Sequence, residues 1–121
     1  MKKTIYYLIA LTTSFTIQAQ NYVNQVLILN EGYFDYTNNE IIEPASIGSY
    51  NPMSEVYTEV LELEGMRFAS DLIIDNDVYY VAADTKIFKI NFNTHQIISS
   101  VNCQGVRNLA VVGDKLFATR G

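Results

Sequence analysis

The 121-residue sequence contains one cysteine, no tryptophan and few basic residues. The single thiol, Cys103, cannot form an intramolecular disulfide, and we expect it to be a small buried hydrophobic side chain rather than a reactive one. Eight Lys and Arg against thirteen Asp and Glu leave a net charge of −5. Because binding to a phosphate backbone needs a clustered basic face, the sequence argues against nucleic acid as a partner.

A hydrophobic run long enough to span a membrane is also missing. The apolar run from Ile5 to Ile17 is interrupted by Thr and Ser and is shorter than the ~20 residues that a span needs. With Lys2 and Lys3 before it and Ala19 after it, the run is typical of an export signal. We expect residues 1–19 to be a signal peptide and the rest to be exported to the periplasm or cell surface. A retained membrane anchor is the alternative, and membrane contact is expected only through this segment.

Helical periodicity is absent after the export signal, and short strands take its place. Four segments are rich in β-branched and aromatic residues and are bounded by Asp, Asn, Thr or Gly: residues 72–74, 78–82, 87–91 and 96–101. This pattern predicts consecutive antiparallel strands joined by tight turns.

Parts of this unit recur along the chain. Residues 47–65 align with residues 87–105 at an offset of 40, and residues 72–80 align with residues 109–117 at an offset of 37. Residues 26–29 align with residues 78–81 at an offset of 52, which places twelve extra residues within 31–44. A period near 40 with four strands per copy predicts a β-propeller.

The predicted fold is therefore all-β, a β-propeller of four-stranded antiparallel blades with about two and a quarter blades present. Residues 20–121 would form the N-terminal part of the domain. The expected blades are a partial first at about 26–63, a second at about 69–103 and the start of a third at about 108–121. Because a ring takes at least four blades, we expect a longer protein, and we expect residues 21–121 alone to be marginally stable or aggregated.

Two segments carry a resemblance to a known family. Asp77–Ala82 and Asp114–Thr119 are similar to the repeat of the YVTN-repeat (YncE-like) β-propellers. The opening residues 26–32 and 47–52 resemble the first blade of secreted, surface-associated bacterial members. The resemblance covers residues 26–121, and the family's proline after the inter-blade glycine is absent. It implies a seven-bladed ring and, because some relatives resemble corrinoid-binding surface partners of outer-membrane transporters, such a transporter as a partner.

The longer connections of such blades are predicted to gather on one rim, where binding usually occurs. The candidate ligand-binding residues on this rim are Arg67, Arg107, Tyr33, Phe34, Glu31 and Arg120. Arg67 and Arg107 each lie two residues after an inter-blade glycine. They could grip an anionic or amide-rich ligand, or they could pair with acidic neighbours such as Glu64 or Asp71. Tyr33 and Phe34, with Tyr36, could form a binding patch or cover the open side of the first blade.

Asp71 and Asn108 correspond by repeat, each just before an expected inner strand. They are the candidate ligands of a hard cation such as Ca²⁺, and strand capping is the alternative. No other cofactor is expected. His95 is expected to be exposed and without a partner. The sequence has no Ser-His-Asp set, no phosphate-binding glycine loop and no metal-spaced Cys/His cluster.

These observations favour an exported, non-catalytic binding propeller. Its partner would be a small molecule, a glycan or a surface protein, held on the loop-rich rim. A metal-dependent hydrolase or lactonase is one alternative, and a nonfunctional truncated fragment is another.

Overall fold

The computed structural model describes residues 24–121, and within them the chain forms eleven strands and no helix. The predicted all-β fold class is confirmed. The expected export signal, residues 1–19, lies outside the described residues. The strands are β1 (Val26–Asn30), β2 (Tyr33–Asp35), β3 (Glu40–Glu43), β4 (Ser46–Asn51), β5 (Val56–Glu62), β6 (Ala69–Asp75), β7 (Val78–Ala83), β8 (Lys86–Asn91), β9 (Ile97–Asn102), β10 (Val106–Val112) and β11 (Lys115–Arg120).

All strand pairs are antiparallel and form four small sheets. The first sheet has the order β1-β4-β5, the second has four consecutive strands in the order β6-β7-β8-β9, and the third is the hairpin β10-β11. The strands β2 and β3 pair only with each other. None of the sheets closes on itself, and this arrangement is consistent with a partial propeller.

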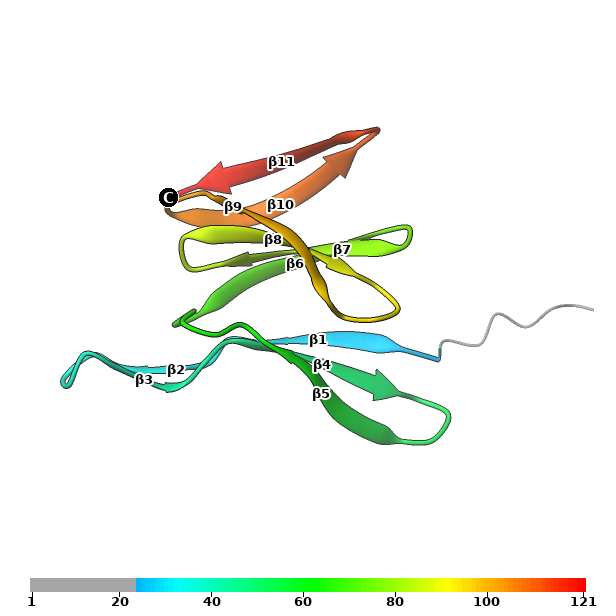
Figure 1. Ribbon diagram of the computed structural model, residues 1–121, viewed down its shortest axis with the longest axis horizontal. Coiled ribbons are helices and arrows are strands. Elements are labelled where there is room, and N and C mark those ends of the chain that lie inside the picture. Colours follow the sequence, from blue (N-terminus) through cyan, green and yellow to red (C-terminus); the bar gives the residue numbers. More distant parts are fainter. Residues whose placement is uncertain (1–23) are drawn as a thin grey trace, which may run out of the picture.

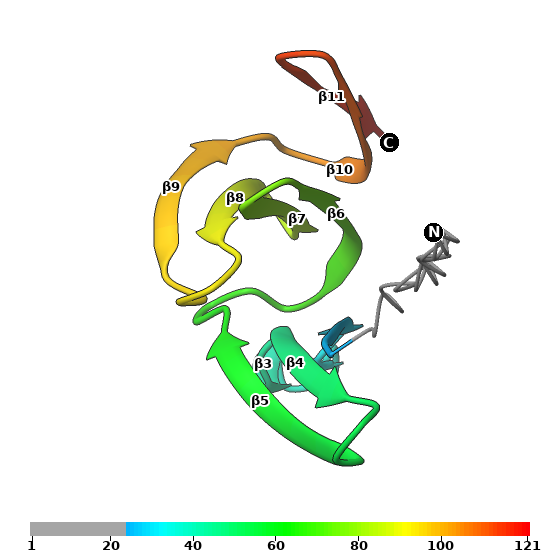
Figure 2. The same cartoon turned by 90° about the vertical axis from the view of Figure 1, so that its right-hand side faces the viewer.

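The first, second and third sheets lie one upon another, as Figure 1 shows from bottom to top. Figure 2 shows the outer strands β5 and β9 on one side of this stack and the strands β6 and β10 on the other. The β2-β3 hairpin projects from one end of the first sheet (Figure 1). The expected long polar connection is therefore a hairpin, which the sequence pattern did not predict.

Two apolar cores hold the stack together. The first lies between the first two sheets and includes Ile47, Tyr79 and Val81, all fully buried. The second lies between the second sheet and the β10-β11 hairpin and includes Ile87 and Leu109. Each sheet thus buries apolar side chains against its neighbour, and this burial is the main favourable contribution to folding.

The predicted offset of 40 is confirmed by hydrogen bonds that recur at that spacing. Leu63 N donates to Ala45 O at 2.8 Å, and Cys103 N donates to Thr85 O at 2.7 Å. The amides of Met53 and Asn93 donate, each at 2.9 Å, to Asn51 Oδ1 and Asn91 Oδ1 respectively. Equivalent turns and loops therefore have the same local structure in the first two sheets.

The offset of 52 for the first strand is wrong by one residue. Val26 pairs with Tyr50, and the equivalent of Tyr50 at an offset of 40 is Ile90, which pairs with Tyr79. Val26 therefore corresponds to Tyr79, at an offset of 53, and the insertion has thirteen residues. The error matters because a slip of one residue moves every side chain of a strand to the opposite face.

The connections separate onto two ends of the stack, as predicted. The β4-β5, β6-β7 and β10-β11 turns lie at one end, on the right of Figure 1. The β7-β8 turn, the connections between sheets and the β2-β3 hairpin lie at the other end. This second end is the loop-rich rim.

Candidate functional site

The loop-rich rim contains a cavity of ≈ 190 Å³ that is lined by two of the three predicted arginines, Arg67 and Arg107. The cavity lies where the second sheet meets the β10-β11 hairpin, and its other lining residues are Phe68, Asp84, Thr85, Gln104, Gly105, Val106 and Gly121. Residues forty positions apart reach one cavity because adjacent copies of the repeat place equivalent loops side by side.

Arg67 is held in place by an ion pair. Its Nε donates to Asp84 Oδ2 at 2.8 Å, and its Nη2 donates to Asp84 Oδ1 at 2.7 Å, which is a bidentate pair. The guanidinium also lies over the rings of Phe34 and Phe68, at 5.4 and 5.0 Å from their centroids. The acidic partner is therefore Asp84, and neither Glu64 nor Asp71 pairs with Arg67.

The ion pair favours the charged forms of both Arg67 and Asp84. Hydrogen bonds from Arg67 lower the pKa of Asp84 below its usual value of 3.8, against a smaller effect of burial. The Asp84 carboxylate in turn raises the pKa of Arg67. The two groups stay charged at neutral pH, and Arg67 keeps its Nη1 group, which carries two N–H donors, outside the pair.

Arg107 is exposed, and among residues 24–121 its guanidinium has no ion pair or hydrogen-bond partner. Arg120 is also exposed, and its Nε donates to the backbone oxygen of Gln104 at 2.8 Å. Gln104 lines the cavity, so Arg120 lies beside it. The cavity is thus bordered by three cations, of which only Arg67 is neutralised within the described residues.

The aromatic residues of the rim are divided between two roles. Phe34 is half-buried and packs edge-on against Tyr36, with ring centroids 5.0 Å apart, as well as under Arg67. Tyr33 is 58% exposed and Tyr36 is 77% exposed. Glu31 is exposed, between β1 and β2. Phe34 therefore attaches the hairpin to the rim, while the two tyrosines face solvent.

Asp71 and Asn108 lie inside β6 and β10, at register shifts, rather than just before these strands. Asp71 Oδ1 accepts from Leu72 N at 2.9 Å, and Asp71 Oδ2 accepts from Leu109 N at 2.7 Å. The backbone N–H of Asn108 donates to Thr119 Oγ1 at 3.1 Å. Both oxygens of Asp71 thus serve backbone groups, and no three His, Cys, Asp or Glu residues within 24–121 converge as metal ligands do.

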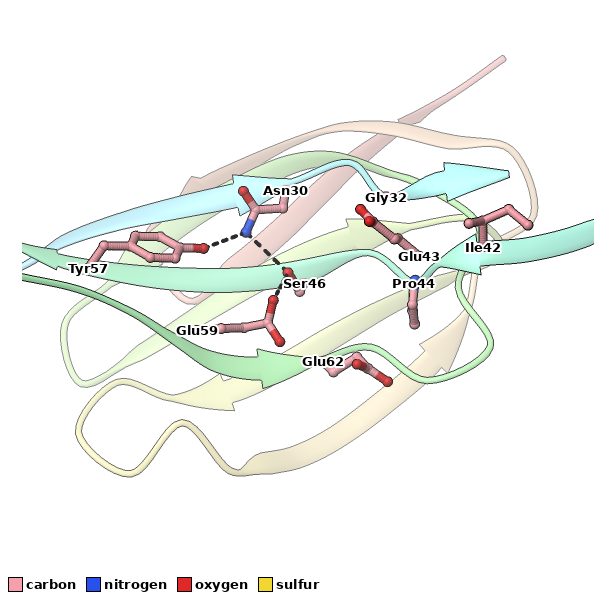
Figure 3. Close-up of a pocket in the computed structure, with 9 residues that line it drawn as sticks. All are labelled: Asn30, Gly32, Ile42, Glu43, Pro44, Ser46, Tyr57, Glu59 and Glu62. Carbon is pink, nitrogen blue, oxygen red and sulfur yellow. Dashed lines mark hydrogen bonds between the residues drawn. The ribbon is translucent and has the colours of Figure 1, made fainter. Parts of the chain in front are cut away.

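A larger hollow of ≈ 470 Å³ lies on the first sheet at the base of the β2-β3 hairpin (Figure 3). Asn30 Nδ2 donates to Ser46 Oγ at 3.1 Å and to Tyr57 Oη at 2.9 Å, and Ser46 Oγ donates to a Glu59 carboxylate oxygen at 2.8 Å. Glu43 and Glu62 also line this hollow. It is acidic, in contrast to the arginine cavity, and the sequence did not single it out.

His95 is not the exposed, unpartnered residue that was expected. It is half-buried, its Nδ1 lies 3.1 Å from Tyr79 Oη, and its Nε2 lies 3.2 Å from Gln25 Nε2. Gln25 Nε2 also donates to Ser49 Oγ at 3.0 Å. The prediction failed because both partners lie far from this turn in the sequence. Tyr79 is in β7, and Gln25 immediately precedes β1 of the neighbouring sheet.

The geometry at His95 selects a neutral ring. Gln25 Nε2 is a donor, so His95 Nε2 accepts, and the ring proton lies on Nδ1, where it donates to Tyr79 Oη. Burial lowers the pKa of His95 below its usual value of 6.5. Burial also raises the pKa of Tyr79 to about 12. This network joins the first and second sheets at the end opposite the loop-rich rim.

No family model matches this chain, and no curated protein matches it. Among residues 24–121, no helix has the length and hydropathy needed to cross a membrane.

Proposed function

We propose that this protein is an exported, non-catalytic binding protein of the YVTN-repeat propeller type whose loop-rich rim holds an anionic ligand. The observation that carries the proposal is the cavity between Arg67 and Arg107, in which Arg107 has no acidic or hydrogen-bonding partner among the described residues. A guanidinium presents a planar set of donors that matches a carboxylate or phosphate. The ligand class is a molecule or surface group that carries such an anion.

The cavity geometry is suited to recognition of a single anionic group. Its volume of ≈ 190 Å³ is below the ~300 to 1,000 Å³ typical of drug-sized ligands, so it accommodates one end of a larger molecule. Arg67 is already oriented by Asp84 and by two aromatic rings, which lowers the entropic cost of binding. The exposed Tyr33 and Tyr36 on the adjacent hairpin offer further contact area.

Two parts of this proposal, membership of the propeller family and export, rest on the sequence. The recurring strand segments around Tyr80 and Phe117 support the first, and the pattern of residues 1–19 supports the second. N-terminal sequencing of the protein recovered outside the cytoplasm tests export, and we expect the mature chain to begin at Gln20.

Calorimetric titration with citrate and with inorganic phosphate tests the binding site. We expect at least one of them to bind with a Kd of about 1 mM or tighter. Arg107→Gln should weaken this binding at least about tenfold, because it removes the free guanidinium. The matched control is Lys89→Gln, which removes one positive charge from outside the cavity and should leave binding unchanged. Equal weakening in both variants, or no binding by the unmodified protein, would contradict the proposal.

A further inference from the structure

A separate hollow of ≈ 480 Å³ lies between the first and second sheets, at the end of the stack where β1 begins and β4 ends (Figure 1). Its lining residues are Asn24, Gln25, Ser49, Asn51, Phe92 and Asn93. Ser49 lies on the same face of β4 as Ile47, and Gln25 lies on the same side of its strand as Leu27. Both apolar residues pack into the first core. The hollow therefore opens between two adjacent sheets, and the described residues supply both of its walls.

The polar lining of this hollow exceeds what the repeat requires. Asn51 recurs as Asn91 at the offset of 40, and the Oδ1 atom of each accepts from a backbone amide of the turn that follows it. At the same offset Ser49 corresponds to Lys89, and at the offset of 53 Gln25 corresponds to a valine at the start of β7. Turn chemistry thus explains Asn51, while Ser49 and Gln25 are polar and uncharged only at this position of the stack.

Several amide groups of the hollow have no hydrogen-bond partner within residues 24–121. Asn51 Oδ1 accepts from two backbone amides at 2.9 and 3.2 Å, which leaves Nδ2 as an unused donor. Gln25 Nε2 donates to Ser49 Oγ at 3.0 Å, which leaves Oε1 as an unused acceptor. Asn24 and Asn93 are exposed, and their side-chain amides are unpaired within these residues. The hollow therefore presents both donors and acceptors, and none of its lining side chains is charged.

Phe92 gives the hollow an apolar wall. Its ring is half-buried and packs edge-on against Tyr79, with centroids 6.5 Å apart and planes at 87°. The backbone N–H of Phe92 donates to the oxygen of Asp77 at 2.9 Å. Because the ring is fixed before a ligand arrives, little conformational entropy is lost on binding. An aromatic ring beside uncharged amides complements a sugar, which has an apolar C–H face and hydroxyls that both donate and accept.

From these observations we propose that the hollow binds a neutral saccharide, with a sugar ring against Phe92 and its hydroxyls bonded to the unused amide groups of Asn51, Gln25 and Asn93. The volume of ≈ 480 Å³ is within the ~300 to 1,000 Å³ typical of small-molecule sites. The lack of charged lining residues distinguishes this ligand from the anion of the arginine cavity. The two sites lie at opposite ends of the stack, so this proposal does not depend on the proposed function.

Calorimetric titration with cellobiose, maltose, lactose and N,N′-diacetylchitobiose, each to about 20 mM, tests the site. We expect at least one of these disaccharides to bind with a Kd of about 5 mM or tighter. Asn93→Ala should weaken this binding about three- to tenfold, the range for loss of neutral hydrogen bonds. The matched control is Asn102→Ala, which makes the same change at an exposed position of β9 outside the hollow. This control and Arg107→Gln should both leave the Kd unchanged.

Nuclear magnetic resonance of the ¹⁵N-labelled protein locates the bound sugar. The disaccharide that binds should shift the side-chain amide signals of Asn51 and leave those of Asn91 unchanged, because Asn91 makes the same turn contacts but does not line the hollow. Each of four results would overturn the proposal: binding by none of the disaccharides, equal weakening by Asn93→Ala and Asn102→Ala, loss of binding in Arg107→Gln, or equal shifts of the two asparagine signals.

Discussion

The carboxylate of Asp71 accepts a hydrogen bond at 2.7 Å from the backbone amide of Leu109, which belongs to the next sheet in the stack. Its other oxygen accepts from the amide of Leu72 in its own strand. One side chain thus joins the inner strands β6 and β10. The amide of Leu109 lies at the register shift of β10, where the regular ladder is interrupted, and Asp71 supplies the acceptor that this amide needs.

Removal of this link should destabilise the fold. We expect Asp71→Ala to lower the free energy of unfolding by about 1.5 to 3 kcal/mol, the range for hydrogen bonds to charged groups, because the Leu109 amide loses its acceptor. Urea unfolding at neutral pH measures the change. The control is Asp77→Ala, at an exposed position of the β6-β7 turn, which should change stability far less. Equal effects of the two substitutions would rule out the proposed role of the Asp71 carboxylate.

The ion pair between Arg67 and Asp84 should make stability depend on acid pH. The pKa of Asp84 is lowered in the folded state, so the unfolded state binds more protons as the pH falls through this range. The stabilisation is complete above about pH 3.8, the pKa of Asp84 in the unfolded state. It is lost as the pH falls through the lower pKa of Asp84 in the folded state. Asp84→Asn keeps a residue type that tolerates the positive φ of 51° at this position.

The measurement compares the two proteins by urea unfolding between pH 7 and pH 3. We expect the unmodified protein to be the more stable at pH 7 and its advantage over Asp84→Asn to shrink below about pH 3.8. An advantage that is independent of pH would show that charge on Asp84 does not contribute.

The network around His95 should produce a second pH dependence at higher pH. His95 is the single histidine of the chain, and its pKa is lowered by burial. Protonation of Nε2 would also place a donor against the donor Gln25 Nε2. The stabilisation is therefore present above about 6.5, the unfolded pKa, and is lost as the pH falls through the lower folded pKa.

Thermal unfolding between pH 8 and pH 5 tests this network. The melting temperature of the unmodified protein should fall in this range, while His95→Asn should start lower and change less with pH. Asn is the matched replacement because the φ of His95 is 57°, a region that Asn tolerates. Parallel pH profiles would mean that His95 titrates equally in the folded and unfolded states.

Gly48 and Tyr57 should show strong coupling. The ring of Tyr57 lies directly over Gly48, where it occupies the space that a β-carbon would need, and its hydroxyl accepts a hydrogen bond from Asn30. Gly48→Ala should therefore destabilise the protein by displacing this ring. In a Tyr57→Ala background the same substitution should stabilise by roughly 0.5 to 1 kcal/mol, because alanine loses less backbone entropy than glycine. A double-mutant cycle measures the coupling, and additive effects would contradict it.

Local patterns predicted most of the fold correctly. The four strands of the second sheet were visible because β-branched and aromatic runs end at Asp, Asn and Gly turns, and such turn chemistry acts within a few residues. The offset of 40 was visible because equivalent turns, such as those after Asn51 and Asn91, need the same side-chain acceptor. The register of β1 was misjudged because a strand of only apolar residues gives no indication of which face is buried.

The candidate site was predicted only in outline. The sequence placed Arg67 and Arg107 at equivalent loops, and the structure brings them to one cavity. The choice of Asp84 as partner to Arg67 depended on the conformation of the β7-β8 turn. The β2-β3 hairpin was missed because its strands have only three and four residues and pair only with each other.

The sequence by itself determined the all-β class, the repeat and the end of the stack at which the long connections gather, because hydrophobic patterning and turn chemistry act over short distances. Tertiary structure alone decided which side chains meet across sheets: Asp71 with Leu109, His95 with Gln25, and Arg67 with Asp84 and Phe34. These contacts depend on how one sheet lies on the next, and many residue pairs of similar chemistry compete for each of them. The sequence pattern does not indicate which of these competing pairs forms the contact.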